Sequence, residues 1–265
     1  MNDPHPTSSP TQSISKFERA KIINYSLRPA KNIERKMMGE AFARLTSLCA
    51  LSEYRYVGFG SEFFNDFSLY HQTLGIRQMV SIERDEKRMA RCEFNRPYKC
   101  VEVLQGTASQ VLPTLSWKRR SIVWLDYTEK LSESILEDVR FVVSQASSGS
   151  LLVWTVNSEP WAGEHDEDSG DAVKQSEWPK KRLQKLRNLV GAKRVRSELT
   201  GSELAQWGLA KVFHEILTDE IRSTLNDRNA AASEAAKLAF RQCFHFRYAD
   251  GQRMLTVGGI LLNPA

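Results

Sequence analysis

The fold is decided by residues 54–61, Tyr-Arg-Tyr-Val-Gly-Phe-Gly-Ser, a short apolar run that ends in two glycines. This pattern predicts a β-strand that turns tightly into a helix over residues 61–74, with Ser61 as the N-cap. Glycines let the backbone approach a ligand closely, and a helix N-terminus offers free N–H groups. We therefore expect the loop Gly58-Phe59-Gly60-Ser61 to border a cofactor site.

Beyond this loop, strand-like and helix-like patterns alternate along the chain. Strands are predicted over 54–58, 76–82, 100–104, 121–125 and 150–156, and helices over 61–74, 85–95, 109–115 and 132–146. The fourth and fifth strands are apolar throughout, which is typical of parallel strands covered on both faces. The fold class expected is α/β, with a doubly wound and mostly parallel sheet.

The N-terminal flank is expected to add a tail and a helical cap. Residues 1–15 are polar and rich in Pro and Ser, which predicts a disordered tail, and residues 16–50 predict the cap. Its two helices, 16–24 and 31–49, should separate at Arg28-Pro29, because proline disfavours helical geometry at the residue before it. Six apolar residues of the second helix recur at helical spacing and should face a core: Ile33, Met37, Met38, Ala41, Phe42 and Leu45.

The C-terminal part completes a domain that we place at residues 51–265. An acidic loop at 158–177, a basic helix at 179–190 and helices at 201–226 and 229–241 form a predicted insertion at about 158–240. Thr200 and Glu203 have the spacing of a capping box for the third of these segments. Strands at 243–248 and 254–262 follow, joined by the hairpin signal Asp250-Gly251, so that the sheet has seven strands.

The bulk composition is that of an ordinary globular protein. The 265 residues are 41% hydrophobic and 26% charged, and the net charge of +5 permits an anionic partner without demanding one. The four cysteines lack CxxC spacing, so we expect buried thiols and no zinc or disulfide framework: Cys49, Cys92, Cys100 and Cys243. Since no membrane span or signal-peptide core is visible, the protein is expected to be cytoplasmic, without a membrane partner.

An acidic residue adds to the cofactor hypothesis. Glu83 ends the second predicted strand, 25 residues after Gly58, where a carboxylate can hold ribose hydroxyls. The alternative is that the glycines serve only a tight structural turn. The spacing to Glu83 favours a nucleotide-like cofactor.

Four successive blocks resemble the motifs of class I S-adenosylmethionine-dependent methyltransferases, especially the small O-methyltransferase-like branch. They are VGFGSEFF at 57–64, VSIERD at 80–85, VEVLQGTASQVLPTL at 101–115 and SIVWLDYTEKL at 121–131. The resemblance implies a Rossmann-like sheet whose seventh strand is antiparallel, N-terminal helices over the cofactor cleft, and S-adenosylmethionine as the cofactor.

The same resemblance implies roles for individual residues. Gly58, Phe59, Gly60 and Ser61 would pass the methionine part of the cofactor. Glu83 and Arg84 would lie at the ribose, and Gly106, Thr107 and Ala108 at the adenine. Asp126 would face the methyl donor and acceptor as a general base, with Tyr127 orienting the acceptor. The alternatives are that Asp126 caps backbone N–H groups and that Tyr127 only packs on the cofactor.

Three positions depart from the motifs. Tyr56 stands where an acidic residue usually precedes the first glycine, Glu62 replaces a third glycine, and Thr107 replaces an adenine-binding Asp. A second function therefore stays open: a catalytically silent binding or assembly module for a nucleic acid, a nucleotide-like ligand or a protein partner. A nicotinamide-dependent oxidoreductase is less favoured, because the third glycine is missing.

Two basic clusters, residues 28–36 and 180–196, are candidates for contact with nucleic-acid phosphates. Solvated helix faces paired with the acidic loop are the alternative. The candidate contacts to a substrate or nucleic acid are Arg28, Lys31, Arg35 and Trp161, and the acceptor is unidentified. His165 stands alone among acids, so no metal site is expected.

Overall fold

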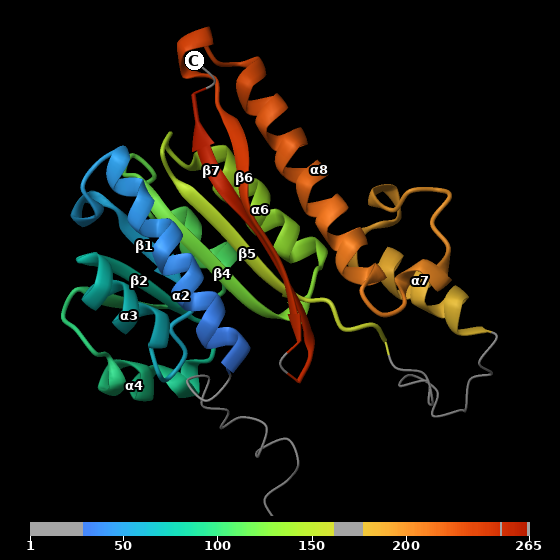
Figure 1. The fold of residues 1–265 in the computed structure, drawn as a ribbon, viewed down its shortest axis with the longest axis horizontal. Coiled ribbons are helices and arrows are strands. Elements are labelled where there is room, and N and C mark those ends of the chain that lie inside the picture. The colour runs from blue at the N-terminus through green and yellow to red at the C-terminus, as the bar shows by residue number, and fades with distance from the viewer. Residues whose placement is uncertain (1–28, 162–176, 250, 264–265) are drawn as a thin grey trace, which may run out of the picture.

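The computed structural model describes residues 29–161, 177–249 and 251–263. A seven-stranded sheet in the order β3-β2-β1-β4-β5-β7-β6 runs through the molecule (Figure 1). The strands are β1 Arg55–Gly58, β2 Gln78–Glu83, β3 Val101–Gln105, β4 Ser121–Lys130, β5 Leu151–Asn157, β6 Ala239–Ala249 and β7 Arg253–Leu262. β7 is antiparallel to both of its neighbours, whereas β1 to β5 pair in parallel, so the expected fold class is confirmed.

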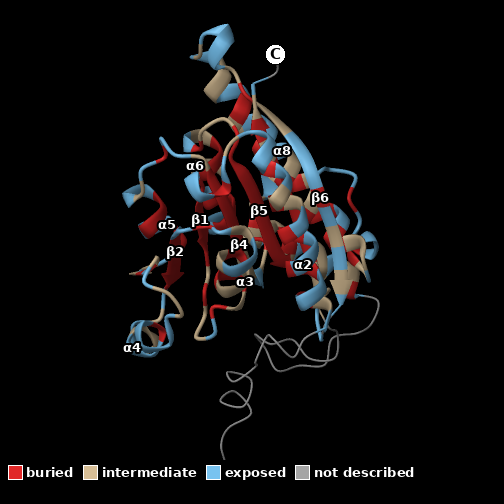
Figure 2. Ribbon diagram, turned by 60° about the vertical axis from the view of Figure 1, so that its left-hand side comes forward, coloured by how far each residue is buried: buried red, intermediate tan, exposed pale blue. Residues whose placement is uncertain are grey.

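Helices cover both faces of the sheet. The face with α2 Pro29–Ala43, α3 Asn65–Leu74 and α4 Glu86–Asn95 has its own core, which includes Tyr56. The other face carries α5 Ala108–Val111, α6 Glu133–Gln145, α7 Trp178–Val190 and α8 Gly208–Ala230 over a core that includes Val57. Because neighbouring strand residues point to opposite faces, β1 and β4 are buried on both sides (Figure 2).

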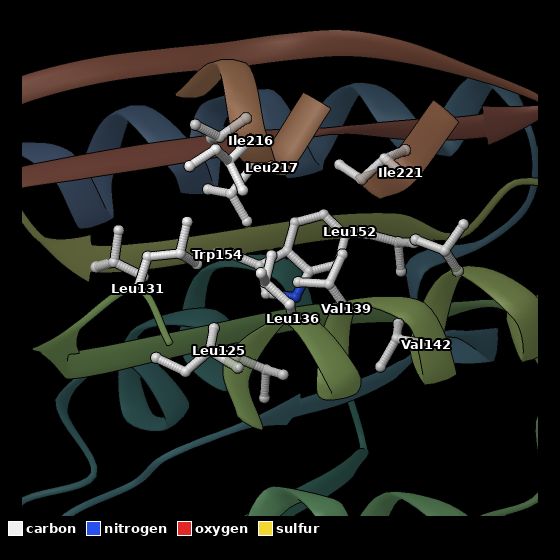
Figure 3. Close-up of a cluster of buried hydrophobic side chains, with 14 of the residues drawn as sticks. Leu125, Leu131, Leu136, Val139, Val142, Leu152, Trp154, Ile216, Leu217 and Ile221 are labelled. Carbon is white, nitrogen blue, oxygen red and sulfur yellow. The ribbon is translucent and has the colours of Figure 1, made fainter. Parts of the chain in front are cut away.

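The larger core lies between the sheet and the pair α6 and α8. Leu125 of β4 and Trp154 of β5 meet Leu136 of α6 and Leu217 of α8 there (Figure 3). Short 3-10 helices complete the chain at Arg44–Ser47, Leu51–Glu53, Leu112–Thr114, Ala192–Arg194, Gly201–Leu204 and Glu234–Ala236. This packing holds the central strands rigid, and their carboxyl ends therefore hold fixed positions at one edge of the sheet.

The predicted helix over 229–241 is wrong. α8 ends at Ala230, and the chain enters β6 at Ala239, opposite Leu262 of β7. The alanine-rich sequence favours a helix locally, but the ladder with β7 satisfies the backbone instead. Asn229 closes the turn, because its side chain bonds both the N–H and the C=O of Leu238, at 2.9 and 2.8 Å.

The predicted inner face of α2 is wrong in part. Met38, Phe42 and Leu45 are buried as expected, but Ile33 is 57% exposed and Met37 is 48% exposed. Lys31, Glu34 and Arg35 are buried in their place. The reason is that the first turns of α2 meet polar groups of β4, β6 and β7, described below.

Two predicted helix starts are also wrong. α3 begins at Asn65, and Ser61 lies in the turn before it with a φ of 50°. The capping box of Thr200 and Glu203 exists, but it caps the 3-10 helix Gly201–Leu204 rather than α8. Cys92 is buried as expected, whereas Cys243 is exposed on β6.

Several predictions lie outside the described residues. They concern the tail 1–15, the helix 16–24, Arg28, His165 and most of the acidic loop. Within the described part of the chain, no helix combines the length and the apolar character needed to cross a membrane.

Candidate active site

A cavity of about 340 Å³ opens at the carboxyl ends of β1, β2 and β4. β1 lies between β2 and β4, and the strand order reverses there, which is where open α/β sheets bind ligands. Most of the predicted cofactor residues line the cavity: Phe59, Ser61, Glu83, Arg84, Gly106, Thr107, Ala108 and Asp126, joined by Tyr127. Gly58 and Gly60 are not among the residues that line it.

Gly60 is required by the protein's own packing. A Cβ at Gly60 would lie 2.5 Å from Ser81 Oγ and 2.6 Å from the Phe64 ring. The Gly60 N–H also donates to Ser81 Oγ at 3.0 Å, which ties the loop to β2. These contacts bring the loop close to β2 and thereby shape one wall of the cavity.

Glu62, at the third-glycine position, anchors the loop to α4. Its carboxylate pairs with Arg88 and with Arg91, each at 3.1 Å, and its carbonyl accepts from Asn95 at 2.9 Å. Burial would raise the pKa of this carboxyl, but the two arginines outweigh it and lower the pKa. Glu62 therefore holds the loop through ion pairs that a glycine at this position could not form.

Glu83 keeps its expected place at the end of β2. It is buried, and its Oε1 accepts the N–H of Asp85 at 2.9 Å. A carboxylate offers about four lone-pair sites, so Glu83 can still accept from ligand hydroxyls. Beside it, Arg84 pairs with Glu129 of β4 at 2.6 Å, across the end of β1.

An acidic residue, Asp66, lies next to Tyr56, which occupies the motif position where an acidic residue is usual. Asp66, in the first turn of α3, lines the cavity and accepts a hydrogen bond from the Tyr56 hydroxyl. Burial raises the pKa of Asp66, and the charge of Arg35, which also lines the cavity, opposes the rise. The sequence offered no signal for Asp66, because its partner lies on β1 and meets it only in the folded chain.

Asp126 lines the cavity from β4 and is paired with a lysine. Lys31 Nζ lies 2.8 Å from Asp126 Oδ2 and 2.8 Å from Glu34 Oε2, and it donates to the Tyr248 hydroxyl at 3.1 Å. Burial would lower the pKa of Lys31, but Asp126 and Glu34 raise it above its ordinary value. The predicted general base therefore faces a buried ammonium group.

This pairing belongs to a buried polar network that joins five elements. Glu34 accepts from the Tyr248 hydroxyl at 2.9 Å and from Thr256. Thr256 meets Thr155 at 2.8 Å, and Thr155 accepts from Trp124 Nε1 at 2.9 Å. The network links α2 to β4, β5, β6 and β7, so α2 is docked by polar contacts as well as by its apolar face.

Tyr127 is held by contacts with α6 and with the glycine loop. Its hydroxyl donates to Asp138 Oδ2 of α6 at 2.7 Å, and its ring packs edge-on against Phe59 at 5.1 Å. Burial raises the pKa of Asp138 to about 6, against the opposing hydrogen bond from Tyr127. Asp138 Oδ1 is buried without a hydrogen-bond partner among the described residues, although Asp138 lines the cavity.

Asp138 was missed by the sequence reasoning, although a signal exists. It lies among the buried apolar residues Ile135, Val139 and Val142 of α6, where a carboxylate needs a reason to be present. Thr107 caps α5, and Gln110 Oε1 accepts its N–H at 2.9 Å. Asp138 of α6 and Thr107, the N-cap of α5, line the same cavity.

The structure places the predicted substrate contacts in three different surroundings. Arg35 lines the cavity, Lys31 is buried in the network, and Trp161 packs against the larger core with Lys130 Nζ 5.5 Å from its ring centroid. In the basic segment 180–196, Arg194 pairs with Glu220 at 2.9 Å.

The comparisons bear on both fold and family. The family model described as "Putative O-methyltransferase" matches residues 23–265. The chain is similar in structure to Trm1 from Pyrococcus horikoshii in complex with S-adenosyl-L-methionine (TM-score 0.51, 10% identity, 86% of this chain and 56% of that chain). It also resembles the O-methyltransferase TomG from Streptomyces achromogenes in complex with SAM (TM-score 0.40, 14% identity, 83% and 79% covered).

No curated protein matches this chain. The likeness to Trm1 shows the fold alone at this identity, while the family model spans almost the whole chain. The chain belongs to the O-methyltransferase family whose model it matches, within the class I S-adenosylmethionine-dependent methyltransferases, for which S-adenosylmethionine is the cofactor.

Proposed function

We propose that this protein transfers a methyl group from S-adenosylmethionine to a hydroxyl group of an acceptor. The observation that supports it best is the cavity, which gathers Glu83, Asp138 and Asp126 at one edge of the sheet. The acceptor set fits the cofactor, because Asp138 Oδ1 is a buried acceptor to which no group of the described residues donates. The volume of about 340 Å³ lies within the usual range for ligand pockets.

Each end of the cofactor has a candidate partner. Glu83 would accept from the ribose hydroxyls, and Asp138 would accept from the adenine amino group in place of the missing Asp at Thr107. Asp66 and Arg35 carry charges opposite to those of the ammonium and carboxylate of the methionine part, and both line the cavity. These charges explain how Tyr56 can replace the acidic motif residue.

The chemical step demands little of the protein. The cofactor supplies a methyl group on a sulfonium, and the transfer is a displacement whose rate depends on alignment. The acceptor hydroxyl must lose its proton, and Asp126 is the candidate base. The Lys31 ammonium, 2.8 Å from Asp126, would stabilise negative charge that develops on the acceptor oxygen.

Calorimetry with S-adenosylmethionine and S-adenosylhomocysteine tests the proposal. We expect both ligands to bind, and Glu83→Gln to weaken binding at least about tenfold, since one lost charge-assisted hydrogen bond costs about 1.5 kcal/mol or more. Arg222→Gln on the exposed side of α8 is the control and should bind normally. If a folded protein binds neither ligand at millimolar concentration, the proposal is wrong.

The ion pair between Lys31 and Asp126 favours a second candidate, a module that binds the cofactor but does not catalyse. In that case Asp126 serves only to dock α2. Incubation with S-adenosylmethionine and a panel of hydroxylated compounds separates the two. Formation of S-adenosylhomocysteine that Asp126→Asn abolishes, while ligand affinity persists, supports the enzyme and rejects the silent module.

A further inference from the structure

A second hollow lies at the opposite edge of the sheet. It has a volume of about 850 Å³ and is lined at the amino ends of β1, β2 and β4 by Arg55, Gln78 and Arg120, together with Lys118 and Arg119. The cofactor cavity is at the carboxyl ends of the same strands, so the two sites do not overlap.

The hollow holds four cationic side chains against a single carboxylate, that of Glu53. Within the described ranges, none of these four cations forms an ion pair within 4.0 Å. Their hydrogen bonds go to neutral groups instead. Arg119 donates to the Glu53 carbonyl at 3.3 Å, and Arg120 donates to the Ser148 carbonyl at 3.2 Å.

Arg55 is the fixed point of this cluster. It is buried, its guanidinium donates to Ser121 Oγ at 3.1 Å, and it lies 5.2 Å from the centroid of the Trp117 ring. Its Nε is buried and has no hydrogen-bond partner in the described part of the chain. Burial first, and then the charge of Arg119, lower the pKa of Arg55. An anion in the hollow would relieve this repulsion.

The other two basic segments are compensated in part. Lys31 of α2 is buried and paired with Asp126, and Arg194 and Arg196 pair with Glu220 and Glu203. Guanidinium groups bind phosphate oxygens in a planar, bidentate manner, which suits a site with three arginines. Ser116 also lines the hollow, and its hydroxyl can donate to phosphate.

We propose that this hollow binds a ligand that carries more than one phosphate group, held by Arg55, Lys118, Arg119 and Arg120. Such a ligand is either a small polyphosphate compound or the backbone of a single-stranded nucleic acid. The wide, open hollow can admit a chain of phosphates. This site does not use α7, the basic helix that the sequence analysis had considered for phosphate contact. The proposal is independent of methyl transfer, because the two sites lie at opposite edges of the sheet.

Two probes distinguish the sources: pyrophosphate by calorimetry, and a short fluorescent oligoribonucleotide by anisotropy. The test variant is Lys118→Glu/Arg119→Glu, at two exposed positions. The matched control is Lys180→Glu/Lys193→Glu, which changes the charge equally in the exposed part of the other basic segment. Lys118→Gln/Arg119→Gln should fall between the wild type and the test variant.

We expect the test variant to weaken binding at least about tenfold and to reduce the salt slope of oligonucleotide binding by about 1.4, since each lost phosphate contact removes about 0.7. The control should stay within about twofold of the wild type, and all variants should retain the wild-type circular dichroism spectrum. Binding of the oligonucleotide alone assigns the site to nucleic acid, and binding of pyrophosphate assigns it to small polyphosphates. The proposal is overturned if neither probe binds the wild type, or if the control loses as much affinity as the test variant.

Discussion

Replacing Lys31 by Met tests whether the buried network docks α2. The change keeps the length of the side chain but removes an ammonium that contacts Asp126, Glu34 and Tyr248. Glu34 is 3% exposed and would lose its counter-ion. The pKa of Lys31 is raised above its ordinary value of 10.5, so its stabilising effect is fully present at pH 7 and is lost only as the pH rises above that value.

The expected loss is about 3–5 kcal/mol in the free energy of unfolding, the usual effect of removing one partner of a buried pair. Glu34→Gln in the Lys31→Met background should recover more than about 1 kcal/mol, because it removes the uncompensated charge. The control is Arg222→Met. Its partner Asp219 lies at 2.7 Å, but both side chains are exposed, so the loss should stay below about 1 kcal/mol.

Urea denaturation followed by tryptophan fluorescence measures these differences, and hydrogen exchange across α2 locates them. We expect faster exchange in α2, and exchange in the central strands that changes only with global stability. A loss below about 1 kcal/mol for Lys31→Met, or no recovery in the double variant, would refute the view that the network is a buried electrostatic unit.

Three further changes test other parts of the structure. The pKa of Asp138 is about 6, above its ordinary 3.8, so protein stability should fall as the pH rises from about 4 to about 6, and Asp138→Asn should flatten this dependence in thermal melts at stepped pH. Gly60→Ala places a Cβ 2.5 Å from Ser81 Oγ, and urea denaturation should show a loss of about 1–3 kcal/mol from overpacking. Arg228 donates to the carbonyls of Val143 and Ala146 at the end of α6, both at 2.8 Å. Arg228→Met should therefore lower the free energy of unfolding by about 1–3 kcal/mol, again measured by urea denaturation. An unchanged stability of Gly60→Ala or of Arg228→Met would contradict the role given to that residue.

The sheet could be predicted because its evidence is local. An apolar run bounded by turn residues identifies each parallel strand. Glu83 ends β2, and Asp126 follows the apolar half of β4, which continues to Lys130, so both residues line the same cavity. The turn at Gly58 to Ser61 follows from the same pattern. Pairing with β7 could not be read locally, and for that reason the alanine-rich residues before β6 suggested a helix.

The completed site depended on tertiary contacts. Asp66 reaches Tyr56 across ten positions of the sequence, and Asp138 reaches Tyr127 across eleven, so neither pair forms a motif. Lys31 and Asp126 form an ion pair although they lie far apart in the sequence. Helical periodicity identified an apolar face on α2, but the polar surface that α2 meets decided which residues were buried.

The sequence alone therefore determined the α/β sheet, the loop from Gly58 to Ser61 and the placement of Glu83 and Asp126 after apolar strand segments, because backbone propensity and burial periodicity act over a few residues. Only the tertiary structure decided which carboxylates surround the cavity, what holds Asp126, and which cations remain without an acidic partner in the described residues. The physical reason is that charge compensation depends on distance in space, and residues far apart in the chain supply it.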